Sequence, residues 1–228
     1  RVPVAAITGT NGKTTTSRML AHILKMTGYT VGLTSTDGVY IDGKLTVAGD
    51  MTGPKSSQMV LRDPAVDAAV METARGGLLR GGLGFRRCNV AACLNVAADH
   101  LGLRGIETVP EMAELKEFIV QRARGAVVLN ADNAYSAGML PRLAETGHDV
   151  LVGQTSEGMA ESGVAVHRLH QLGEGPPLHH RQAVDRLVVL LFVVVEHQRQ
   201  RGHVDEVLGD QPAAQQLRHQ GAGDEKSV

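Results

Sequence analysis

A run near the start of the chain, Thr8-Gly-Thr-Asn-Gly-Lys-Thr-Thr15, has the residue types and spacing to bind phosphate. A glycine-containing turn between a strand and a helix points several backbone N–H groups at one spot, and the helix dipole favours an anion there. We predict a nucleotide-binding loop here rather than a chance Gly-Lys-Thr turn. Its predicted cofactor-binding residues are Gly9, Thr10, Asn11, Gly12, Lys13, Thr14 and Thr15.

Within this loop, each residue type suits a different part of a nucleoside triphosphate. Gly9 and Gly12 remove side chains where the backbone must approach the phosphates. Lys13 supplies a charge for the β- and γ-phosphate oxygens, which makes it a candidate catalytic residue, and Thr14 offers a hydroxyl to Mg²⁺. The loop departs from the usual Gly-x-x-x-x-Gly-Lys-Ser/Thr pattern because Ile7 stands at the first glycine position.

Two further candidate ligands follow buried, strand-like runs. Glu72 lies near the end of run 67–73, and His100 follows run 89–95, directly after Asp99. Ligands of open α/β sheets lie outside the carboxyl ends of the strands, so we expect both side chains beside the phosphate loop. A carboxylate there is a natural Mg²⁺ ligand, and a neutral imidazole can bind a metal. The alternatives are a water-exposed glutamate and a turn held by local hydrogen bonds.

Basic side chains near these strand ends are weaker candidates. The glycine-rich stretch 74–84 predicts a tightly bent loop, in which Arg75 or Arg80 would meet an anionic group. The same stretch would also suit a plain flexible loop. Lys116 lies on the next predicted helix, where composition alone predicts an ordinary solvated lysine.

Up to Pro141 the pattern alternates strand and helix signals, which predicts an α/β fold. The expected architecture is a mostly parallel sheet flanked by helices, with the phosphate loop at its edge. A hairpin over 39–47 should turn at Asp42-Gly43. The remaining expected strands cover 2–7, 29–34, 67–73, 89–95 and 126–130, and the expected helices cover 14–26, 56–61 and 108–124.

Beyond Pro141 the sequence becomes rich in His, Gln and Arg. We predict an ATP-binding domain over 1–141, incomplete because the chain starts directly on a strand, and an atypical tail over 142–228. Residues 149–152 are expected to add one more strand, and the end of the tail has little to bury and should be disordered. One hypothesis is that the tail derives from a frameshift.

Bulk composition narrows the functional classes. The formal net charge of −1 gives no broad field for nucleic acid or an anionic membrane. The longest apolar run, 187–195, is shorter than the ~20 residues that span a bilayer, so we expect no membrane partner and a cytoplasmic location. The cysteines, Cys88 and Cys93, are five positions apart, which would place them on opposite faces of a strand. We predict two buried, unpaired thiols.

Together these residues resemble the ATP-dependent Mur ligase superfamily, which includes peptidoglycan-building amino-acid ligases, folylpolyglutamate synthetases and cyanophycin synthetases. The resemblance rests on 8–15, Glu72 and Asn95-Val-Ala-Ala-Asp-His100. The segments Gly49-Asp-Met-Thr-Gly-Pro54 and 70–85 are more similar to the cyanophycin synthetases than to the wall ligases. The resemblance covers about the first 140 residues.

The resemblance implies an enzyme that activates a carboxylate with ATP and Mg²⁺, giving an acyl phosphate that an amine captures as an amide. For the cyanophycin synthetases it implies addition of arginine to aspartate side chains of a poly-aspartate (cyanophycin) primer. It also implies that Thr14 and Glu72 hold one metal and His100 a second. Lys116 matches a lysine that is carbamylated in several relatives, which makes Glu72, His100 and Lys116 catalytic candidates beside Lys13.

Two alternatives stay open. One is a cell-wall precursor or folylpolyglutamate-type ligase. The other is a catalytically incomplete nucleotide-binding module, because the segment that relatives use for the base and their amino-acid-binding domain are not recognisable after Pro141. A homo-oligomer is compatible with the sequence.

Overall fold

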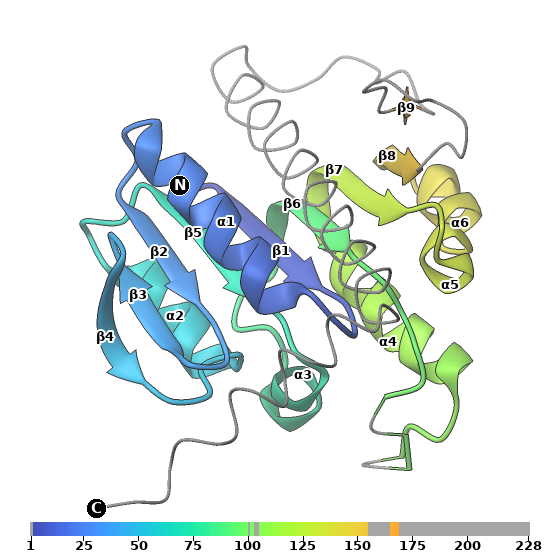
Figure 1. Cartoon of the computed structure of the whole chain (residues 1–228), viewed down its shortest axis with the longest axis horizontal. Helices are drawn as coiled ribbons and strands as arrows, with labels where there is room; N and C mark the ends of the chain where they lie inside the picture. Colours follow the sequence, from blue (N-terminus) through green and yellow to red (C-terminus); the bar gives the residue numbers. More distant parts are fainter. Residues whose placement is uncertain (1, 100, 103–104, 155–164, 169–228) are drawn as a thin grey trace, which may run out of the picture.

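The computed structural model describes residues 2–99, 101–102, 105–154 and 165–168. Its strands form one sheet in the order β4-β3-β2-β5-β1-β6-β7-β8-β9 (Figure 1). The described strands are β1 (Val4–Thr8), β2 (Val31–Thr34), β3 (Gly38–Ile41), β4 (Lys44–Ala48), β5 (Ala68–Glu72), β6 (Cys88–Cys93), β7 (Ala123–Asn130), β8 (Asp149–Gln154) and β9 (Ala165–Arg168).

The central strands are parallel, and the edges are not. β2, β5, β1, β6, β7 and β8 run parallel to one another. β3 pairs antiparallel with β2 and β4, and β9 pairs antiparallel with β8. β1 and β5 are buried along their whole length, as expected for strands covered on both faces. The predicted fold class, a mostly parallel sheet flanked by helices, is confirmed.

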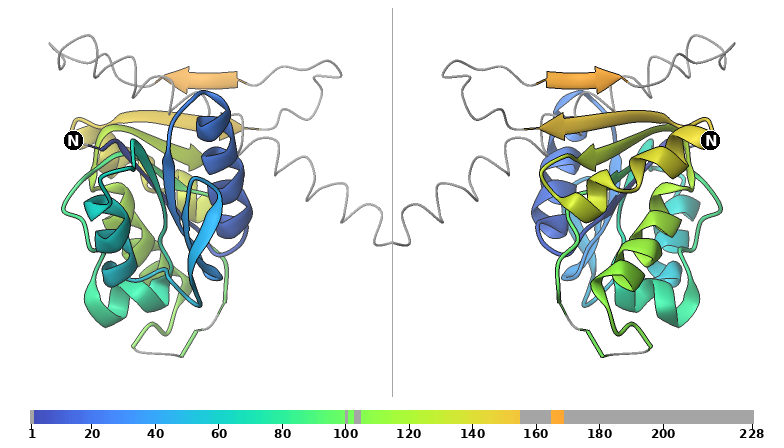
Figure 2. Two further views of the ribbon diagram at one scale, coloured as in Figure 1. Left: turned by 90° about the vertical axis from the view of Figure 1, so that its left-hand side faces the viewer. Right: turned by 90° about the vertical axis from the view of Figure 1, so that its right-hand side faces the viewer.

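The helices divide between the two faces of the sheet. Among the described helices, α1 alone packs on one face, through Leu20 and Leu24 against Ile7 and its neighbours. The opposite face is covered by α2, α4 and α6 (Figure 2). Val60, Met112 and other apolar side chains fill the space between these helices and the sheet. The described helices are α1 (Lys13–Met26), α2 (Pro54–Arg62), α3 (Arg75–Gly81), α4 (Val109–Val120), α5 (Ala134–Ala137) and α6 (Leu140–Glu145).

Several predicted elements lie where the sequence placed them. The hairpin of β3 and β4 turns at Asp42 (φ 50°) and Gly43 (φ 77°), as expected. Helix α4 starts with a reciprocal capping box, in which Glu111 N–H donates to the Thr108 hydroxyl and the Glu111 carboxylate accepts from the Thr108 N–H. The predicted end of this helix at residue 124 is wrong, because Ala123 already pairs with Cys88 and is buried in the sheet.

The glycine-rich stretch is the main correction to the predicted elements. Residues 75–81 form helix α3 rather than a bent loop. A glycine within this helix and another just after it allow the chain to pack very close to the start of α2. A Cβ at Gly77 would lie 2.2 Å from the carbonyl oxygen of Thr52, and one at Gly84 would lie 2.3 Å from that of Pro54. Close backbone approach, and not flexibility, therefore explains these two glycines.

The cysteine prediction is half right. Cys88 and Cys93 are buried and free, and burial raises the pKa of their thiols to about 12 and about 11. However, both side chains belong to the same core cluster, on one face of the sheet. The pairing of β6 with β7 shifts register between Cys88 and Val90, and this irregularity reverses the expected alternation.

The sheet continues past the predicted domain boundary. Helix α6 runs across residue 141, and β8 pairs in parallel with β7 from Ala126 onward. The boundary at residue 141 stays a prediction. The tail from 169 lies outside the described residues, so its predicted disorder and its predicted frameshift origin stay predictions too. No described helix has both the length and the hydropathy needed to cross a membrane.

An ion pair ties α6 to α4. The Arg142 Nε donates to both carboxylate oxygens of Glu117, at 2.8 and 3.1 Å, and its Nη2 donates at 2.5 Å. The Glu117 side chain is only 4% exposed, whereas that of Arg142 is 60% exposed. The carboxylate therefore depends on Arg142 and on the Gln121 amide for hydrogen bonds.

We expect Arg142→Ala to lower the free energy of unfolding by about 1–3 kcal/mol, because it leaves a buried carboxylate without its cation. This expected loss of stability is smaller than that for a fully buried ion pair, since water screens the exposed guanidinium. Urea denaturation would measure it, with Arg62→Ala at the exposed end of α2 as the control. Equal unfolding midpoints for the two variants would contradict the assignment.

Candidate active site

The predicted site residues converge at one edge of the sheet. β1, β5 and β6 end at Thr8, Glu72 and Cys93, and the phosphate loop follows β1. The chain passes from β1 to β2 on one side of β1, and later crosses from β5 to β6 on its other side. Such a switch point opens a crevice outside the carboxyl ends of the strands, which is where open α/β sheets bind ligands.

The phosphate loop has the backbone conformation that its glycines allow. Gly12 is the residue before α1 and has a φ of 81°, which favours glycine. Gly9 passes so close to the next strand that a Cβ there would lie 3.0 Å from the Cβ of Leu94. Helix α1 begins at Lys13, so its free N–H groups face the loop, as an anion site requires.

Asn95 holds the loop in place from the end of β6. Its Oδ1 accepts from the N–H groups of Thr10 and Asn11, both at 2.9 Å, and its Nδ2 donates to the Asn11 carbonyl at 3.3 Å. The Thr10 hydroxyl in turn accepts from the N–H of Ala97 at 3.0 Å. Sequence reasoning named Asn95 only as the end of the expected strand 89–95 and within the resemblance, and this position at a strand end was the available signal for a turn contact.

Replacing Asn95 by alanine removes three hydrogen bonds to the loop. We expect nucleotide affinity to fall about tenfold, because the loop no longer presents its N–H groups in one arrangement. Asn89→Ala is the matched control, since Asn89 Oδ1 accepts a backbone N–H from Val4 at the opposite edge of the sheet. Calorimetric titration with an ATP analogue should separate the two, and equal affinities would contradict the role of Asn95.

Two more asparagines support the segment that carries Asn95. Asn133 Oδ1 accepts from Val96 N–H at 3.1 Å, while its Nδ2 donates to the Val96 carbonyl at 3.0 Å. Asn130 Nδ2 donates to the Leu94 carbonyl at 3.0 Å. The ends of β6 and β7 are therefore joined by side-chain amides, and the sequence prediction did not include Asn130 or Asn133.

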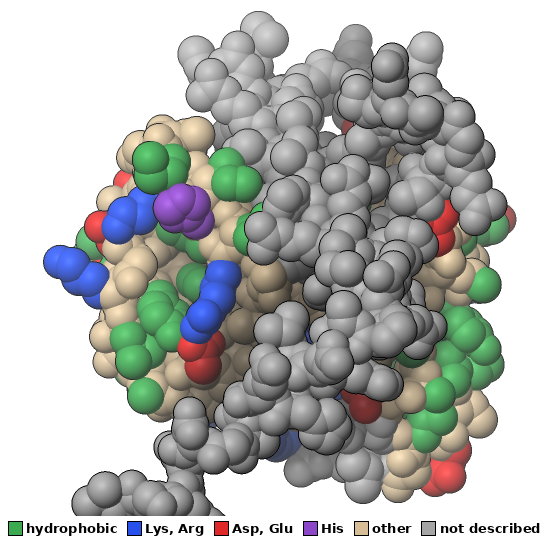
Figure 3. Space-filling view, in the orientation of Figure 1, with side chains coloured by type: hydrophobic (Ala, Val, Ile, Leu, Met, Phe, Trp, Pro, Cys, Tyr) green, Lys and Arg blue, Asp and Glu red, His purple; other side chains and the backbone are tan. Residues whose placement is uncertain are grey.

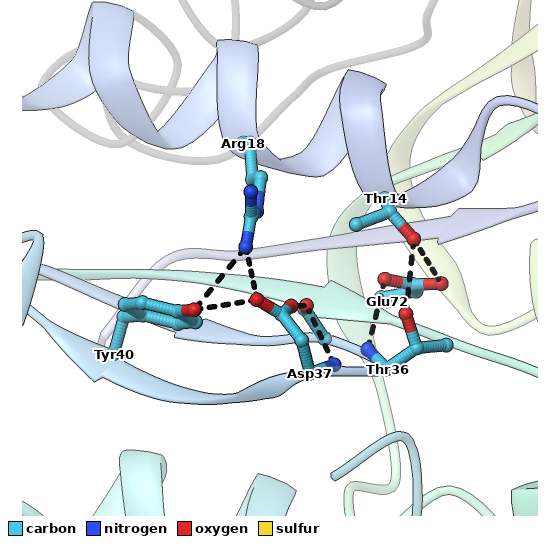
Figure 4. Close-up of polar contacts among 7 residues, drawn as sticks. Thr14, Arg18, Thr36, Asp37, Tyr40 and Glu72 are labelled. Atoms are coloured by element: carbon cyan, nitrogen blue, oxygen red, sulfur yellow. Dashed lines mark hydrogen bonds and ion pairs between the residues drawn. The ribbon is translucent and has the colours of Figure 1, made fainter. Parts of the chain in front are cut away.

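Thr14 and Glu72, the predicted metal ligands, lie in direct contact (Figure 4). The Thr14 hydroxyl donates to Glu72 Oε1 at 3.0 Å, and the Thr36 N–H donates to Oε2 at 3.3 Å. Burial raises the pKa of the Glu72 carboxyl, while the hydrogen bond from Thr14 and the charge of Lys13 lower it.

One carboxylate and one hydroxyl suit Mg²⁺. This ion usually keeps several waters and takes one or two carboxylates together with substrate phosphates, rather than an all-protein cage. Among the residues that the structure describes, no three His, Cys, Asp or Glu side chains gather at one point. Thr14 and Glu72 therefore fit a metal shared with a nucleotide. The second predicted metal ligand, His100, lies outside the described residues.

Lys13 is folded back over the loop. Its Nζ donates to the Thr10 carbonyl at 2.7 Å. Burial lowers the pKa of this ammonium, and the charges of Glu72 and Asp99 raise it. The ammonium thus lies on the loop and within electrostatic range of two carboxylates.

Lys116 is not the solvated lysine that composition suggested. It is only 5% exposed, on the buried side of α4. Burial lowers the pKa of its ammonium to about 8. Cys93 and Asp99 oppose this shift, whereas the positive charges of Lys13 and Arg75 act in the same direction as burial. The structure therefore brings Lys116 within electrostatic range of the phosphate loop.

The two other basic candidates, Arg75 and Arg80, have different partners. Arg75, at the start of α3, interacts electrostatically with Lys116. Arg80 instead forms an exposed ion pair with Asp50 at 3.4 Å. Whether either meets an anionic ligand stays a prediction. Sequence reasoning missed a neighbouring cluster in which Arg18 and Tyr40 both donate to the Asp37 carboxylate, next to Thr36 (Figure 4).

Comparison with known protein families shows which family this chain belongs to. The sequence profile of the Mur ligase middle domain matches residues 7–173. The chain belongs to this family. The matched range includes the phosphate loop, Glu72 and Lys116, so the candidate site lies inside the part of the chain that matches the Mur ligase middle domain.

Curated relatives of this Mur ligase domain are similar over somewhat less than two thirds of its length. It is 54% identical over 145 residues to the cyanophycin synthetase of Synechocystis sp., covering 63% of this chain and 17% of that protein. It is 57% identical over 141 residues to the cyanophycin synthetase of Crocosphaera subtropica, covering 61% and 16%. The chain thus spans less than a fifth of the length of these relatives.

Solved structures agree with the Mur ligase fold. A UDP-N-acetylmuramoyl-L-alanyl-D-glutamate–2,6-diaminopimelate ligase is 26% identical with a TM-score of 0.55, over 66% of this chain and 31% of that one. A bifunctional folylpolyglutamate synthase/dihydrofolate synthase, solved with Mn, AMPPNP and L-glutamate bound, covers 83% of this chain and 53% of its own. At 19% identity and a TM-score of 0.53, that likeness concerns the fold alone.

Proposed function

We propose that this chain is the ATP-binding part of an amide ligase that activates a carboxylate as an acyl phosphate. The observation that carries the proposal is the contact between Thr14 and Glu72 at the mouth of the phosphate loop, with Lys13 beside them. A loop alone is compatible with many nucleotide-binding proteins. A buried carboxylate on the loop threonine adds a place for a metal bound to the nucleotide phosphates.

The residues of the chain would divide the work as phosphoryl transfer requires. This reaction asks the protein mainly for positioning and for neutralisation of charge. The loop N–H groups and Lys13 would hold the phosphates, and Asn95 would keep the loop in shape. Thr14 and Glu72 would hold Mg²⁺, which supplies positive charge to the phosphate oxygens. His100 is proposed as a ligand of a second metal.

Lys116 is proposed as a carbamylated lysine, as the resemblance implies. Carbamate formation needs a neutral amine, because CO₂ reacts with the free base and not with the ammonium. A pKa of about 8 leaves an appreciable neutral fraction near pH 7, which an exposed lysine does not have. The carbamate would place a negative charge within electrostatic range of Lys13 and Arg75.

For the substrate, we propose arginine addition to aspartate side chains of a poly-aspartate primer, in the cytoplasm. The support is the identity of 54–57% to proteins named cyanophycin synthetase. A wall-precursor ligase is the weaker candidate, at 31% identity over 147 residues to one such enzyme. We also propose that 1–141 forms the main part of the ATP-binding unit, to which α6 and β8 belong as well because β8 continues the sheet beside β7.

We expect Glu72→Gln to remove most of the gain in ATP affinity that Mg²⁺ provides. The amide keeps the size of the side chain and can accept one hydrogen bond, but it lacks the charge that binds the metal. Affinity without Mg²⁺ should change little. Titrations with and without Mg²⁺ measure the difference, and Glu107→Gln, an exposed glutamate, is the control. A wild-type response to Mg²⁺ would rule out Glu72 as a ligand.

The test of the function is ATP turnover with a poly-aspartate primer and arginine. Phosphate release matched by arginine incorporation, and abolished in Lys13→Ala, supports the proposal for the isolated chain. Our expectation is nucleotide binding with little or no ligation, because the chain spans less than a fifth of the relatives. The same assay on the full-length protein should then show ligation. Its absence there, or turnover with wall precursors instead, would refute the substrate assignment.

A further inference from the structure

A second cavity lies at the opposite edge of the sheet from the phosphate loop. Its volume is about 780 Å³, and it opens beside the amino ends of β1 and β6, where Val4 and Cys88 begin the strands. A strand of five residues spans about 16 Å, so the cavity is separated from the loop by the length of β1. It therefore belongs to a different site.

The cavity is lined by four arginines and by two phenylalanine rings, and its lining contains no aspartate or glutamate. Arg122 stacks over the ring of Phe118, 4.1 Å from its centroid, which holds this guanidinium in a fixed orientation. The side chains concerned are Arg86, Arg87, Arg122, Arg124, Phe85 and Phe118.

The four cavity arginines differ from several other arginines in the described part of the chain. Arg18, Arg80 and Arg142 each form an ion pair with a carboxylate. Over the face that carries α1, basic and acidic side chains are interspersed (Figure 3). Within the described part of the chain, none of the four cavity arginines forms an ion pair. A concave surface with charge of one sign concentrates the field and favours an oppositely charged ligand.

We propose that this cavity binds a carboxylate-rich peptide segment. Guanidinium groups match carboxylates with paired hydrogen bonds, and the apolar lining would accept the methylene groups and backbone of a peptide. The volume lies in the range of sites that enclose a small ligand, enough for a few residues. Nucleic acid is disfavoured because the chain has a net charge of −1 and the arginines line a pocket instead of an extended stripe.

The evidence for this inference is the cavity alone, but its ligand class matches the poly-aspartate primer, so the inference also rests on the proposed function. The experiment is fluorescence anisotropy of a labelled deca-aspartate peptide with the complete 228-residue chain. We expect saturable binding that weakens with salt and no binding of a neutral Ser-Gly peptide of equal length. Arg87→Ala combined with Arg124→Ala should raise the Kd at least about tenfold. The control, Arg62→Ala combined with Lys44→Ala, removes the same charge elsewhere and should not.

Two further comparisons make the result decisive. Lys13→Ala should bind the peptide normally, so a failure of the phosphate loop cannot be confused with a failure of the cavity. The substituted arginines are exposed, so each variant is expected to fold, and thermal melting checks this. The proposal is overturned by no peptide binding, by equal losses in both double variants, or by tighter binding of a deca-thymidylate oligonucleotide than of the peptide.

Discussion

Replacing Lys13 by alanine is expected to lower the affinity for ATP at least about 100-fold, which is the largest effect on binding that the site predicts. Charge-assisted hydrogen bonds contribute about 1.5–3 kcal/mol each, and this ammonium is placed to make more than one with the phosphates. It is partly desolvated beside the loop, with Glu72 and Asp99 as its counter-charges. The loop N–H groups would remain, so weak binding of phosphate should survive.

A matched control for this variant lies on the same helix. Lys25 is in the last turn of α1, where its ammonium pairs with Asp42 at 3.2 Å and its side chain is 43% exposed. Lys25→Ala removes the same charge from the same helix and should leave ATP affinity unchanged. Calorimetric titration of both variants with an ATP analogue makes the comparison. If both lose affinity equally, Lys13 acts only through the general field of the protein.

Lys116→Met is expected to stabilise the protein at pH 7, by about 3 kcal/mol at most. The pKa of Lys116 is about 8 in the folded protein against 10.5 for an unperturbed lysine, so folding disfavours its protonated form. Below pH 8 both states are protonated, and the full cost is present. Between pH 8 and 10.5 the folded state binds fewer protons than the unfolded state, so wild-type stability should rise relative to the variant.

The measurement is urea denaturation of both proteins from pH 7 to 10.5, in buffers freed of bicarbonate so that the amine stays unmodified. The difference in unfolding free energy between Lys116→Met and wild type should shrink toward zero over that range. Lys55→Met, at an exposed position on α2, is the control and should show no such trend. A variant that is less stable than wild type at pH 7 would mean that the lysine forms favourable contacts which outweigh burial.

Much of the fold and the loop was predictable, because the relevant signals are local. The apolar runs of the central strands, the turn at Asp42-Gly43 and the Gly-Lys-Thr step into α1 each depend on residues adjacent in sequence. The rule that ligands lie at the carboxyl ends of parallel strands then predicted that Glu72 would face the loop, as its bond to Thr14 shows.

What was not predicted depends on contacts between distant residues. The helical form of 75–81 requires the close approach of Gly77 to Thr52, and the shared face of the two cysteines requires a register shift against β7. The three amide contacts of Asn95 cross more than 80 positions of sequence. The burial of Lys116 follows from how α4 packs on β6. Its spacing, four residues after Met112 and three before Ile119, was the signal that could have placed it on the buried face.

The most direct test of the central claim is a crystal structure of this chain with Mn²⁺ and a non-hydrolysable ATP analogue, because Mn²⁺ can be located by its anomalous signal. The account predicts the phosphates against the N–H groups of 9–15, with a Mn²⁺ ion contacting both the Thr14 hydroxyl and the Glu72 carboxylate. Phosphates bound away from this loop, or a Mn²⁺ ion that contacts the phosphates but not Glu72, would contradict it.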